Sequence, residues 1–589
     1  MARKVLIVGG VAGGASAAAR LRRIDEEAEI IVFEKGGYIS YANCGLPYYI
    51  GGVIKDRKKL LVQTPETMKA RFNIDIRTQN EVTGIDRAQK RVRVKDHKTG
   101  REYYEAYDKL VLSPGARPIK PGFPGIDLPT IFTLRDIPDT DRIKDFIDSR
   151  KPGTAVVVGG GFIGLEAAEN LYNQGIEVSI VEMAPQVMLS LDPEMAAIVH
   201  NYLRDKDVKL YLGDGVKGFY IKNDDYGNGS GNGNEDREKD GDGDGDGGAG
   251  TRAAVNNKTI VELCSGRRIE TDMVILAIGV RPDVTLAKDA GLEIGERGGI
   301  AVNEYLETSD PDIYAIGDAI EVTDFTTGRR IPIPLAGPAN KQGRIVADNI
   351  CGRKQKYAGT QGTAIVKVFD LVVATTGGNE KTLRELGRPC ISSIIHPASH
   401  AGYYPGGVPI SLKIVFAPDG LLLGAQAVGR DGVDKRIDVL ATAIRFGKSV
   451  FDLQELELAY APPYSSAKDP VNMAGYVAGN ILNGDVDIIH CNEIEGLDRD
   501  RTLLLDVREP FECQMGVIEG SVNIPLDQLR GRLQELPRDK DIVVYCQVGL
   551  RAYLACRILM QHGFKHVKNL SGGWRTYQAV MRDREAKKS

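Results

Sequence analysis

The chain has 589 residues, which exceeds what one hydrophobic core supports, so we expect about three to five domains. Its net charge of −4, with 26% charged residues, gives no electrostatic reason to expect binding to nucleic acid or to an anionic membrane. The first apolar run, Val5–Val8, is too short for a signal peptide, and no run approaches the ~18 apolar residues of a membrane span. Eight cysteines without a CxxC pair indicate neither a disulfide framework nor a metal site, and a reducing cytoplasm is the expected setting.

The first half of the chain alternates apolar runs with helix-like stretches, as parallel sheets with crossover helices do. Two units share one order of strand, glycine-rich turn, helix and second strand. They cover residues 5–8, 9–14, 15–23 and 30–33 in the first unit and 155–158, 159–164, 165–174 and 178–181 in the second. The order predicts an α/β fold with two Rossmann-like domains.

Both glycine-rich turns indicate a diphosphate site at a helix N-terminus. The expected phosphate-binding residues are Gly9, Gly10, Gly13 and Gly14 in the first turn and Gly159, Gly161 and Gly164 in the second. Val11 replaces the middle glycine of the first turn, whereas the second turn has all three. Glu34 and Glu182 end the following strands, where an acid holds a ribose hydroxyl. Glu182 favours NADH, because it would repel the 2′-phosphate of NADPH, which stays open as the alternative.

Later apolar strands that end in glycine support the first unit as a flavin site. The residues expected to contribute to it are Ser113, Gly115, Gly279, Gly317 and Asp318.

Residues 223–250 are rich in glycine, aspartate and asparagine and almost lack apolar residues. Such a segment cannot bury enough surface to offset its ordering entropy, so we expect a disordered surface insertion. Its aspartates do not fit a calcium-binding EF-hand loop, since Thr251 stands where the twelfth-position glutamate is required, counting from Asp240.

Together these motifs make residues 1–480 resemble the FAD- and NAD(P)H-dependent pyridine nucleotide–disulfide oxidoreductases. The resemblance implies that Asp318 binds the flavin ribityl chain, that the helix start near Ala336 lies over the flavin pyrimidine, and that Lys35 joins the FAD site. It also implies three domains, which we expect at 1–117 with 282–325 for FAD, 118–281 for NAD(P)H and 326–482 for α+β dimerisation. Residues 490–589 are expected to form a separate C-terminal α/β domain.

Cys44 follows the first unit in the segment SYANCGLPYY and stands alone. Many members of the family have a second cysteine five residues later, where this chain has Tyr49. A lone thiol beside a flavin must cycle through a mixed disulfide, a sulfenate or a persulfide. For catalysis it needs a lowered pKa, which we expect from the reduced flavin environment and a helix dipole.

The Cys44 segment resembles coenzyme A disulfide reductases and their persulfide-reducing relatives. The resemblance implies a homodimer in which tyrosines of one subunit approach the cysteine of the other and protonate a leaving thiolate. The candidates are Tyr403 or Tyr404 and Tyr460 or Tyr464. Residues expected to bind coenzyme A are Arg22, Ser40, Asn43, Gln63 and Arg71. Arginines suit its phosphates, Ser40 and Asn43 lie in the Cys44 segment, and Gln63 follows it.

Residues 490–589 resemble a rhodanese domain. The matching pieces are Leu505–Pro510, Gly520–Pro525, Val543–Cys546 and Gly572–Trp574. The resemblance implies that the loop Cys546–Arg551 wraps around a catalytic sulfur, with backbone N–H groups and Arg551 stabilising a thiolate or persulfide anion.

The expected function is an NADH-dependent reductase of coenzyme A persulfides, polysulfides or disulfides with a fused sulfurtransferase domain, which releases hydrogen sulfide and free thiol. Two alternatives stay open. One is an NADH oxidase or peroxidase that uses a Cys44 sulfenate, and the other is a sulfur carrier or sensor in which turnover is incidental.

Overall fold

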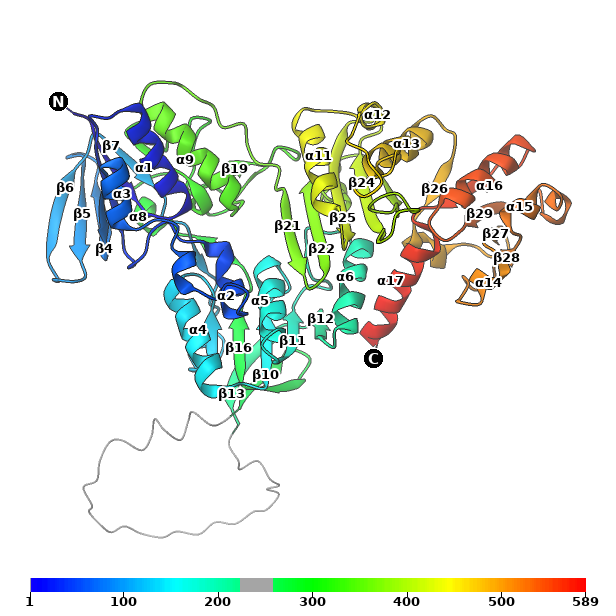
Figure 1. The fold of residues 1–589 in the computed structure, drawn as a ribbon, viewed down its shortest axis with the longest axis horizontal. Coiled ribbons are helices and arrows are strands. Elements are labelled where there is room, and N and C mark those ends of the chain that lie inside the picture. The colour runs from blue at the N-terminus through cyan, green and yellow to red at the C-terminus, as the bar shows by residue number, and fades with distance from the viewer. Residues whose placement is uncertain (1, 223–257, 589) are drawn as a thin grey trace, which may run out of the picture.

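The computed structural model describes residues 2–222 and 258–588, which form several domains packed against one another (Figure 1). The insertion predicted at 223–250 lies outside the described residues. None of the described helices is both long and apolar enough to cross a bilayer.

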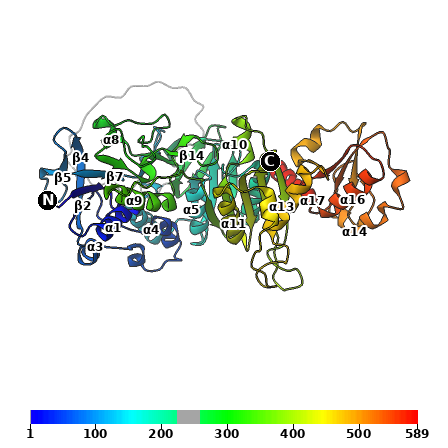
Figure 2. The ribbon, with the colours of Figure 1, turned by 90° about the horizontal axis from the view of Figure 1, so that it is seen from above.

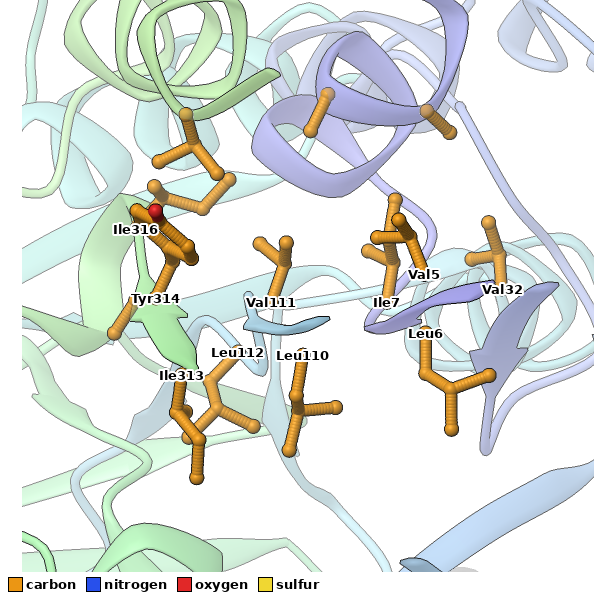
Figure 3. Close-up of a cluster of buried hydrophobic side chains, with 14 of the residues drawn as sticks. Val5, Leu6, Ile7, Val32, Leu110, Val111, Leu112, Ile313, Tyr314 and Ile316 are labelled. Carbon is orange, nitrogen blue, oxygen red and sulfur yellow. The ribbon is translucent and has the colours of Figure 1, made fainter. Parts of the chain in front are cut away.

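The first domain is built on a five-stranded parallel sheet in the order β18-β7-β1-β2-β3. The strands are β1 (Lys4–Val8), β2 (Glu29–Glu34), β3 (Asp75–Thr78), β7 (Lys109–Leu112) and β18 (Ile313–Ala315). Figure 3 shows Ile7 and Val111 on one face of this sheet and Leu6, Leu110 and Leu112 on the other. Both faces are therefore covered, as is usual for a parallel sheet.

Helices α1 (Ala12–Ile24) and α9 (Ala336–Ile350) lie side by side over one face of the sheet (Figure 1). A Cβ on Gly343 of α9 would lie 2.4 Å from the carbonyl oxygen of Gly13, so only glycine allows this approach. The buried residues Val346 and Ala347 of α9 belong to the core of the first domain. This domain thus extends past the boundary expected at residue 325, because the later helix completes its core.

Smaller elements surround this sheet. They are β4 (Asn80–Asp86), β5 (Arg91–Asp96) and β6 (Glu102–Ala106), which form an antiparallel sheet, the short helices α2 (Leu46–Ile50), α3 (Pro65–Phe72) and α8 (Thr285–Asp289), and the pair β19 (Val322–Thr323) and β20 (Arg330–Ile331). The antiparallel pair β8 (Ala116–Pro118) and β17 (Val280–Pro282) connects the first domain to the second.

The second domain repeats the plan with a parallel sheet in the order β12-β11-β10-β16-β9. Its elements are β9 (Ile131–Thr133), α4 (Ile137–Arg150), β10 (Thr154–Val158), α5 (Phe162–Tyr172), β11 (Glu177–Glu182), α6 (Pro193–Asp205), β12 (Lys209–Leu212), β13 (Val216–Ile221), β14 (Thr259–Leu263), β15 (Arg268–Thr271) and β16 (Met273–Leu276). Both expected Rossmann-like units are confirmed.

The third domain has a five-stranded antiparallel sheet in the order β21-β22-β25-β24-β23. Its elements are β21 (Ala364–Val368), β22 (Leu371–Gly377), α10 (Glu380–Glu385), β23 (Ile391–Ile395), β24 (Ile410–Phe416), β25 (Leu422–Gly429), α11 (Val433–Arg445), α12 (Val450–Gln454) and α13 (Pro470–Leu482).

The C-terminal domain lies at the end of the molecule opposite the N-terminus (Figure 2). Its parallel sheet has the order β26-β30-β29-β27-β28. Its elements are β26 (Asp487–Ile489), β27 (Thr502–Asp506), α14 (Pro510–Cys513), β28 (Val522–Asn523), α15 (Leu526–Leu529), β29 (Asp541–Tyr545), α16 (Leu550–Gln561), β30 (Val567–Leu570) and α17 (Gly573–Lys588).

Helix α17 returns from the C-terminal domain to pack on α6 of the second domain (Figure 1). Asp583 lies 3.0 Å from His200 and 2.8 Å from Arg204. Asn201 donates a 2.8 Å hydrogen bond from its amide to the carbonyl oxygen of Ala579. These contacts fix the C-terminal domain against the nucleotide-binding half.

A buried lysine joins the second and third domains. The side chain of Lys413 on β24 is fully buried, with its ammonium 2.8 Å from Asp192 and in ion pairs with Glu194 and Glu380. Burial alone would lower the pKa of Lys413, but the three carboxylates outweigh it and raise that pKa. The ammonium therefore occupies the centre of this acidic cluster.

Replacing Lys413→Ala should destabilise the protein by about 3–5 kcal/mol, because three carboxylates would lose their buried counter-ion. Urea unfolding followed by circular dichroism measures this loss. The control is Lys217→Ala, which removes an exposed lysine 3.1 Å from Glu262 and should leave the midpoint nearly unchanged. Equal midpoints for both variants would contradict a structural role of the cluster.

Candidate active site

The first glycine-rich turn forces the backbone of β1 close to that of β7. Gly9 has φ +98°, and a Cβ there would lie 2.0 Å from the carbonyl oxygen of Ser113. A Cβ on Gly14 would lie 1.9 Å from the carbonyl oxygen of Gly9. Helix α1 then begins with no side-chain cap at Val11, so no side chain competes with a phosphate for its first N–H groups.

The second turn has the same construction. Gly159 has φ +110° and lies against the carbonyl oxygen of Ala277, to which a Cβ would come within 2.3 Å. A Cβ on Gly164 would lie 1.9 Å from the carbonyl oxygen of Gly159, whereas Gly161 faces open space. Helix α5 begins at Phe162, also without a side-chain cap.

Both predicted ribose-binding acids are held by backbone groups. Glu34 accepts hydrogen bonds from the N–H groups of Gly10 (3.0 Å) and Gly36 (2.8 Å). Glu182 accepts from Gly160 (2.7 Å) and Ala184 (2.8 Å). Each carboxylate is thus oriented by its own phosphate turn and retains lone pairs for two ribose hydroxyls.

The remaining glycines and polar residues predicted at the FAD site come from four segments. Ser113 and Gly115 follow β7, Gly279 follows β16, Gly317 and Asp318 follow β18, and Ala336 opens α9. Cβ atoms on Gly13 and Gly317 would lie 3.1 and 3.7 Å from the hydroxyl of Ser113, so these three residues meet at one place.

Asp318 is the residue whose surroundings best fit a bound flavin. Its half-buried carboxylate has no hydrogen-bond partner among residues 2–222 and 258–588, and burial raises its pKa. A half-buried carboxylate with no donor from the protein can accept a hydrogen bond from a ribityl hydroxyl. Lys35, by contrast, pairs with Asp283 at 3.6 Å. Its role at the FAD site stays a prediction.

Cys44 lies in a short turn, Asn43–Gly45, immediately before α2, and is exposed. All eight cysteines are free, so no disulfide partner competes for this thiol. The turn is paired with residues 60–63, since the N–H of Ala42 donates to the carbonyl oxygen of Leu60 at 2.8 Å. The N–H of Gln63 also donates to the carbonyl oxygen of Ser40 at 3.3 Å, so the segments that carry Ser40, Asn43 and Gln63 are paired, and their role as substrate contacts stays a prediction.

The electrostatics at Cys44 differ from the sequence expectation. Burial of one side of the thiol raises its pKa, and the carboxylates of Glu166 and Asp318 raise it further. Among the protein groups these effects outweigh the backbone hydrogen bond that lowers the pKa of Cys44, so the net direction is upward. The flanking helix α2 has only five residues, and the lowering expected from the flavin environment and a helix dipole stays a prediction.

Glu166 and Tyr48 are site residues that the sequence reading missed. The hydroxyl of Tyr48 donates to the carboxylate of Glu166 at 3.3 Å, which joins α2 of the first domain to α5 of the second. Burial raises the pKa of Glu166 to about 7. A group with that pKa beside a reactive thiol can hold or release a proton at neutral pH. Its only signal in the sequence is an acid within the otherwise apolar start of α5.

Arg22 is the clearest error among the predicted coenzyme A contacts. Its side chain is buried, and its guanidinium donates only to backbone carbonyls, those of Asp25, Glu26, Ala28, Phe72 and Asn73. These bonds join the end of α1 to the end of α3 and leave no donor for a phosphate. Arg71, on the exposed side of α3, stays a candidate.

The predicted tyrosines form an exposed aromatic group on loops of the third domain. The hydroxyls of Tyr403 and Tyr460 are 2.7 Å apart, and the ring of Tyr404 packs edge-on against His400. Tyr464 is 72% exposed. Within the described part of the chain no hydrogen bond joins them to Cys44. Such an exposed aromatic surface is typical of a subunit interface.

Cys546 ends β29 of the C-terminal domain and is 1% exposed. The N–H of Gly549 donates to its sulfur at 3.1 Å, and α16 begins at the next residue. Helix α17 supports the loop from behind, since the N–H groups of Trp574 and Arg575 donate to the carbonyls of Cys546 (2.8 Å) and Gln547 (3.0 Å). Backbone donors at a helix N-terminus stabilise a sulfur anion.

The positive charge expected from Arg551 is largely neutralised. Its guanidinium makes two hydrogen bonds to the carboxylate of Glu512, at 2.6 and 2.7 Å. Glu512 also raises the pKa of Arg551, with Cys546 as a further negative neighbour. Arg551 therefore lies within electrostatic reach of the sulfur but shares its charge with Glu512.

Comparison with known proteins places these sites in a family. The sequence model of the pyridine nucleotide-disulphide oxidoreductases matches residues 3–343, and that of their dimerisation domain matches residues 363–470. The chain belongs to the pyridine nucleotide-disulphide oxidoreductases. A rhodanese-like domain model matches residues 494–580 of this oxidoreductase.

Three similar proteins cover most or all of the oxidoreductase. A coenzyme A disulfide reductase of Staphylococcus haemolyticus is 35% identical over 81% of this chain and 100% of its own length. The structure of reduced Bacillus anthracis CoADR-RHD is 53% identical over 99% of both chains, with a TM-score of 0.91. An NAD-dependent persulfide reductase from A. fulgidus is 38% identical over 98% of this chain and 99% of its own, with a TM-score of 0.86. The expected family, the four-domain α/β fold and the dependence on FAD and a nicotinamide dinucleotide are confirmed.

Replacing Glu166→Gln should shift the alkylation midpoint of Cys44 to lower pH, because the Glu166 carboxylate raises the pKa of that thiol. The rate of iodoacetamide labelling of the Cys44 peptide, followed by mass spectrometry against pH, measures it. Glu262→Gln, on the strand β14, serves as the control and should leave the midpoint in place. A midpoint that stays or rises in Glu166→Gln would contradict the coupling.

Proposed function

We propose that this oxidoreductase reduces persulfides, polysulfides or disulfides of a coenzyme A-type thiol with NADH, and that its C-terminal domain transfers sulfane sulfur. The observation that carries the proposal is an exposed, unpaired Cys44 beside the first dinucleotide turn, on the same chain as the loop-bound Cys546. The relatives named for coenzyme A disulfide and persulfide reduction support it.

The proposed chemistry at Cys44 balances with a persulfide substrate. The Cys44 thiolate attacks the outer sulfur of R–S–SH, which forms a Cys44 persulfide and releases R–S⁻. Two electrons from NADH and two protons then cleave the new S–S bond, which yields hydrogen sulfide and the Cys44 thiol. When bound, FAD supplies the two-electron link between the nicotinamide and this sulfur. Glu166, with a pKa of about 7, is placed to exchange one of the protons.

Residues of this chain would hold the two dinucleotides at separate turns. The first turn with Glu34, Ser113 and Asp318 suits FAD, and the second with Glu182 suits NADH. The backbone-bound carboxylate of Glu182 would repel a 2′-phosphate, which supports NADH over NADPH.

We further propose a homodimer in which the tyrosines of one subunit meet Cys44 of the other. The dimerisation-domain match and the exposure of Tyr403 and Tyr464 support this arrangement. A tyrosine hydroxyl brought there would protonate the leaving thiolate. Ser40, Asn43, Gln63 and Arg71 would bind the substrate.

Replacing Cys44→Ser should abolish NADH-dependent sulfide release from a coenzyme A persulfide, because no other described cysteine adjoins the first turn. The control is Cys264→Ser, which removes an exposed cysteine of the second domain and should retain wild-type turnover. Persistent sulfide release in Cys44→Ser would contradict the proposal. NADH consumption that requires oxygen or peroxide would instead favour the oxidase alternative.

The companion variant Cys546→Ser should lose sulfur transfer between a sulfane donor and a small thiol while retaining NADH-dependent persulfide reduction. Loss of sulfur transfer with retained reduction would show that Cys44 and Cys546 carry separate activities. Loss of both activities together would contradict their independence.

A further inference from the structure

A cavity of about 540 Å³ lies where three domains meet, and neither Cys44 nor Cys546 is among its lining residues. Its walls come from α6 of the second domain, the strands of the third-domain sheet, and α17 of the C-terminal domain, and α6 and α17 lie side by side there (Figure 1). Its volume is in the range of sites for small molecules, about 300–1,000 Å³. The mechanism proposed for the two cysteines does not use it.

The lining carries an excess of positive charge. Arg430, Arg575 and Arg582 face the cavity, whereas Asp205 is the carboxylate among its lining residues. Asp205 is already paired with Arg582. Arg430 and Arg575 have no ion-pair or hydrogen-bond partner for their guanidinium groups within residues 2–222 and 258–588.

No neighbouring group substitutes for an anion at these two arginines. Asp370, near Arg430, is already bound to the hydroxyl of Tyr202 (3.2 Å) and pairs with Lys206 (3.5 Å). The guanidinium of Arg575 is partly open to water through the cavity. Burial by the surrounding protein lowers the pKa of Arg575, because no carboxylate compensates for the lost hydration.

The histidine next to Arg575 carries no charge that could replace a ligand. The two ring nitrogens of His396 lie within hydrogen-bond distance of Ser411 (3.0 Å) and Thr576 (2.8 Å). Burial lowers the pKa of His396 to about 3, so this histidine is neutral.

The rest of the lining is suited to an organic group. Ile198, Leu371, Pro409 and Val428 provide an apolar wall. The ring of Tyr202 lies 5.8 Å from the guanidinium carbon of Arg430, so a flat ring and an anionic group would be bound next to each other. A bare inorganic ion would leave most of this volume and its apolar wall unused.

We propose that the cavity binds a phosphorylated organic anion of the nucleotide type, with its phosphates on Arg430 and Arg575 and its ring against Tyr202 and the apolar wall. Arginine guanidinium groups match phosphate oxygens in geometry and charge. The ligand would bridge three domains, and through Arg575 it would contact the helix whose first N–H groups hold the Cys546 loop. The proposal is independent of persulfide reduction.

The only tryptophan of the chain provides a local probe, because Trp574 directly precedes Arg575 and is 7% exposed. ADP titrated into the FAD-loaded, full-length protein should change Trp574 emission in a saturable way. Arg430→Gln and Arg575→Gln should each weaken the apparent affinity at least tenfold, whereas Arg430→Lys and Arg575→Lys should lose less. Arg501→Gln, an exposed arginine of the same domain, is the matched control and should bind as wild type.

Parallel titrations with pyrophosphate and with coenzyme A distinguish the sources of the phosphates. A response to ADP alone identifies a nucleotide, and a tighter response to coenzyme A identifies the thiol coenzyme. Flavin absorbance and circular dichroism verify that the variants are folded. Absence of a saturable Trp574 response to all three probes would overturn the proposal. A response to pyrophosphate alone would also overturn it. The same holds if Arg430→Gln and Arg575→Gln are folded and bind ADP as tightly as the wild type.

Discussion

The constraint on which this structure depends is a parallel strand followed at once by a helix. At that junction the backbone N–H groups of the helix start have no internal partner and point at whatever lies beyond the strand. Among the described junctions of this kind, those after β1, β10 and β29 carry the candidate sites. After β1 and β10, closely packed glycines leave room for a diphosphate. After β29, the N–H of Gly549 donates to the sulfur of Cys546. Fixed donors that suit an anion thus serve both nucleotide binding and sulfur chemistry.

The two thiols have opposite surroundings. Cys546 is buried and is bound by a backbone donor, which favours a stored sulfur anion. Cys44 is exposed, lies between domains and faces Glu166 and Asp318, which raise the pKa of the thiol. The protein groups around the two thiols therefore differ: a backbone N–H donates to the sulfur of Cys546, whereas burial and two carboxylates raise the pKa of Cys44.

Local motifs predicted much of this from the sequence, and contacts between distant segments account for the rest. The glycines with Glu34 and Glu182 lie within single βαβ units, so their spacing alone indicated their places. Glu166 and Tyr48 meet across two domains, which no spacing reveals. Arg22 was misassigned because a basic residue at a helix end usually faces solvent, whereas here the carbonyls that end α1 and α3 surround it. Helix α9 joins the first domain through Gly343, a packing contact that hydrophobic periodicity does not encode.

The central claim is that electrons from NADH reach a sulfur–sulfur bond at Cys44. Its most direct test is the amount of sulfide released for each NADH oxidised, measured anaerobically with the FAD-loaded protein and a coenzyme A persulfide. The balanced reaction predicts equal amounts of sulfide and oxidised NADH, together with one free thiol. NADH oxidation that begins only when oxygen or peroxide is admitted, and that yields no sulfide, would contradict the account.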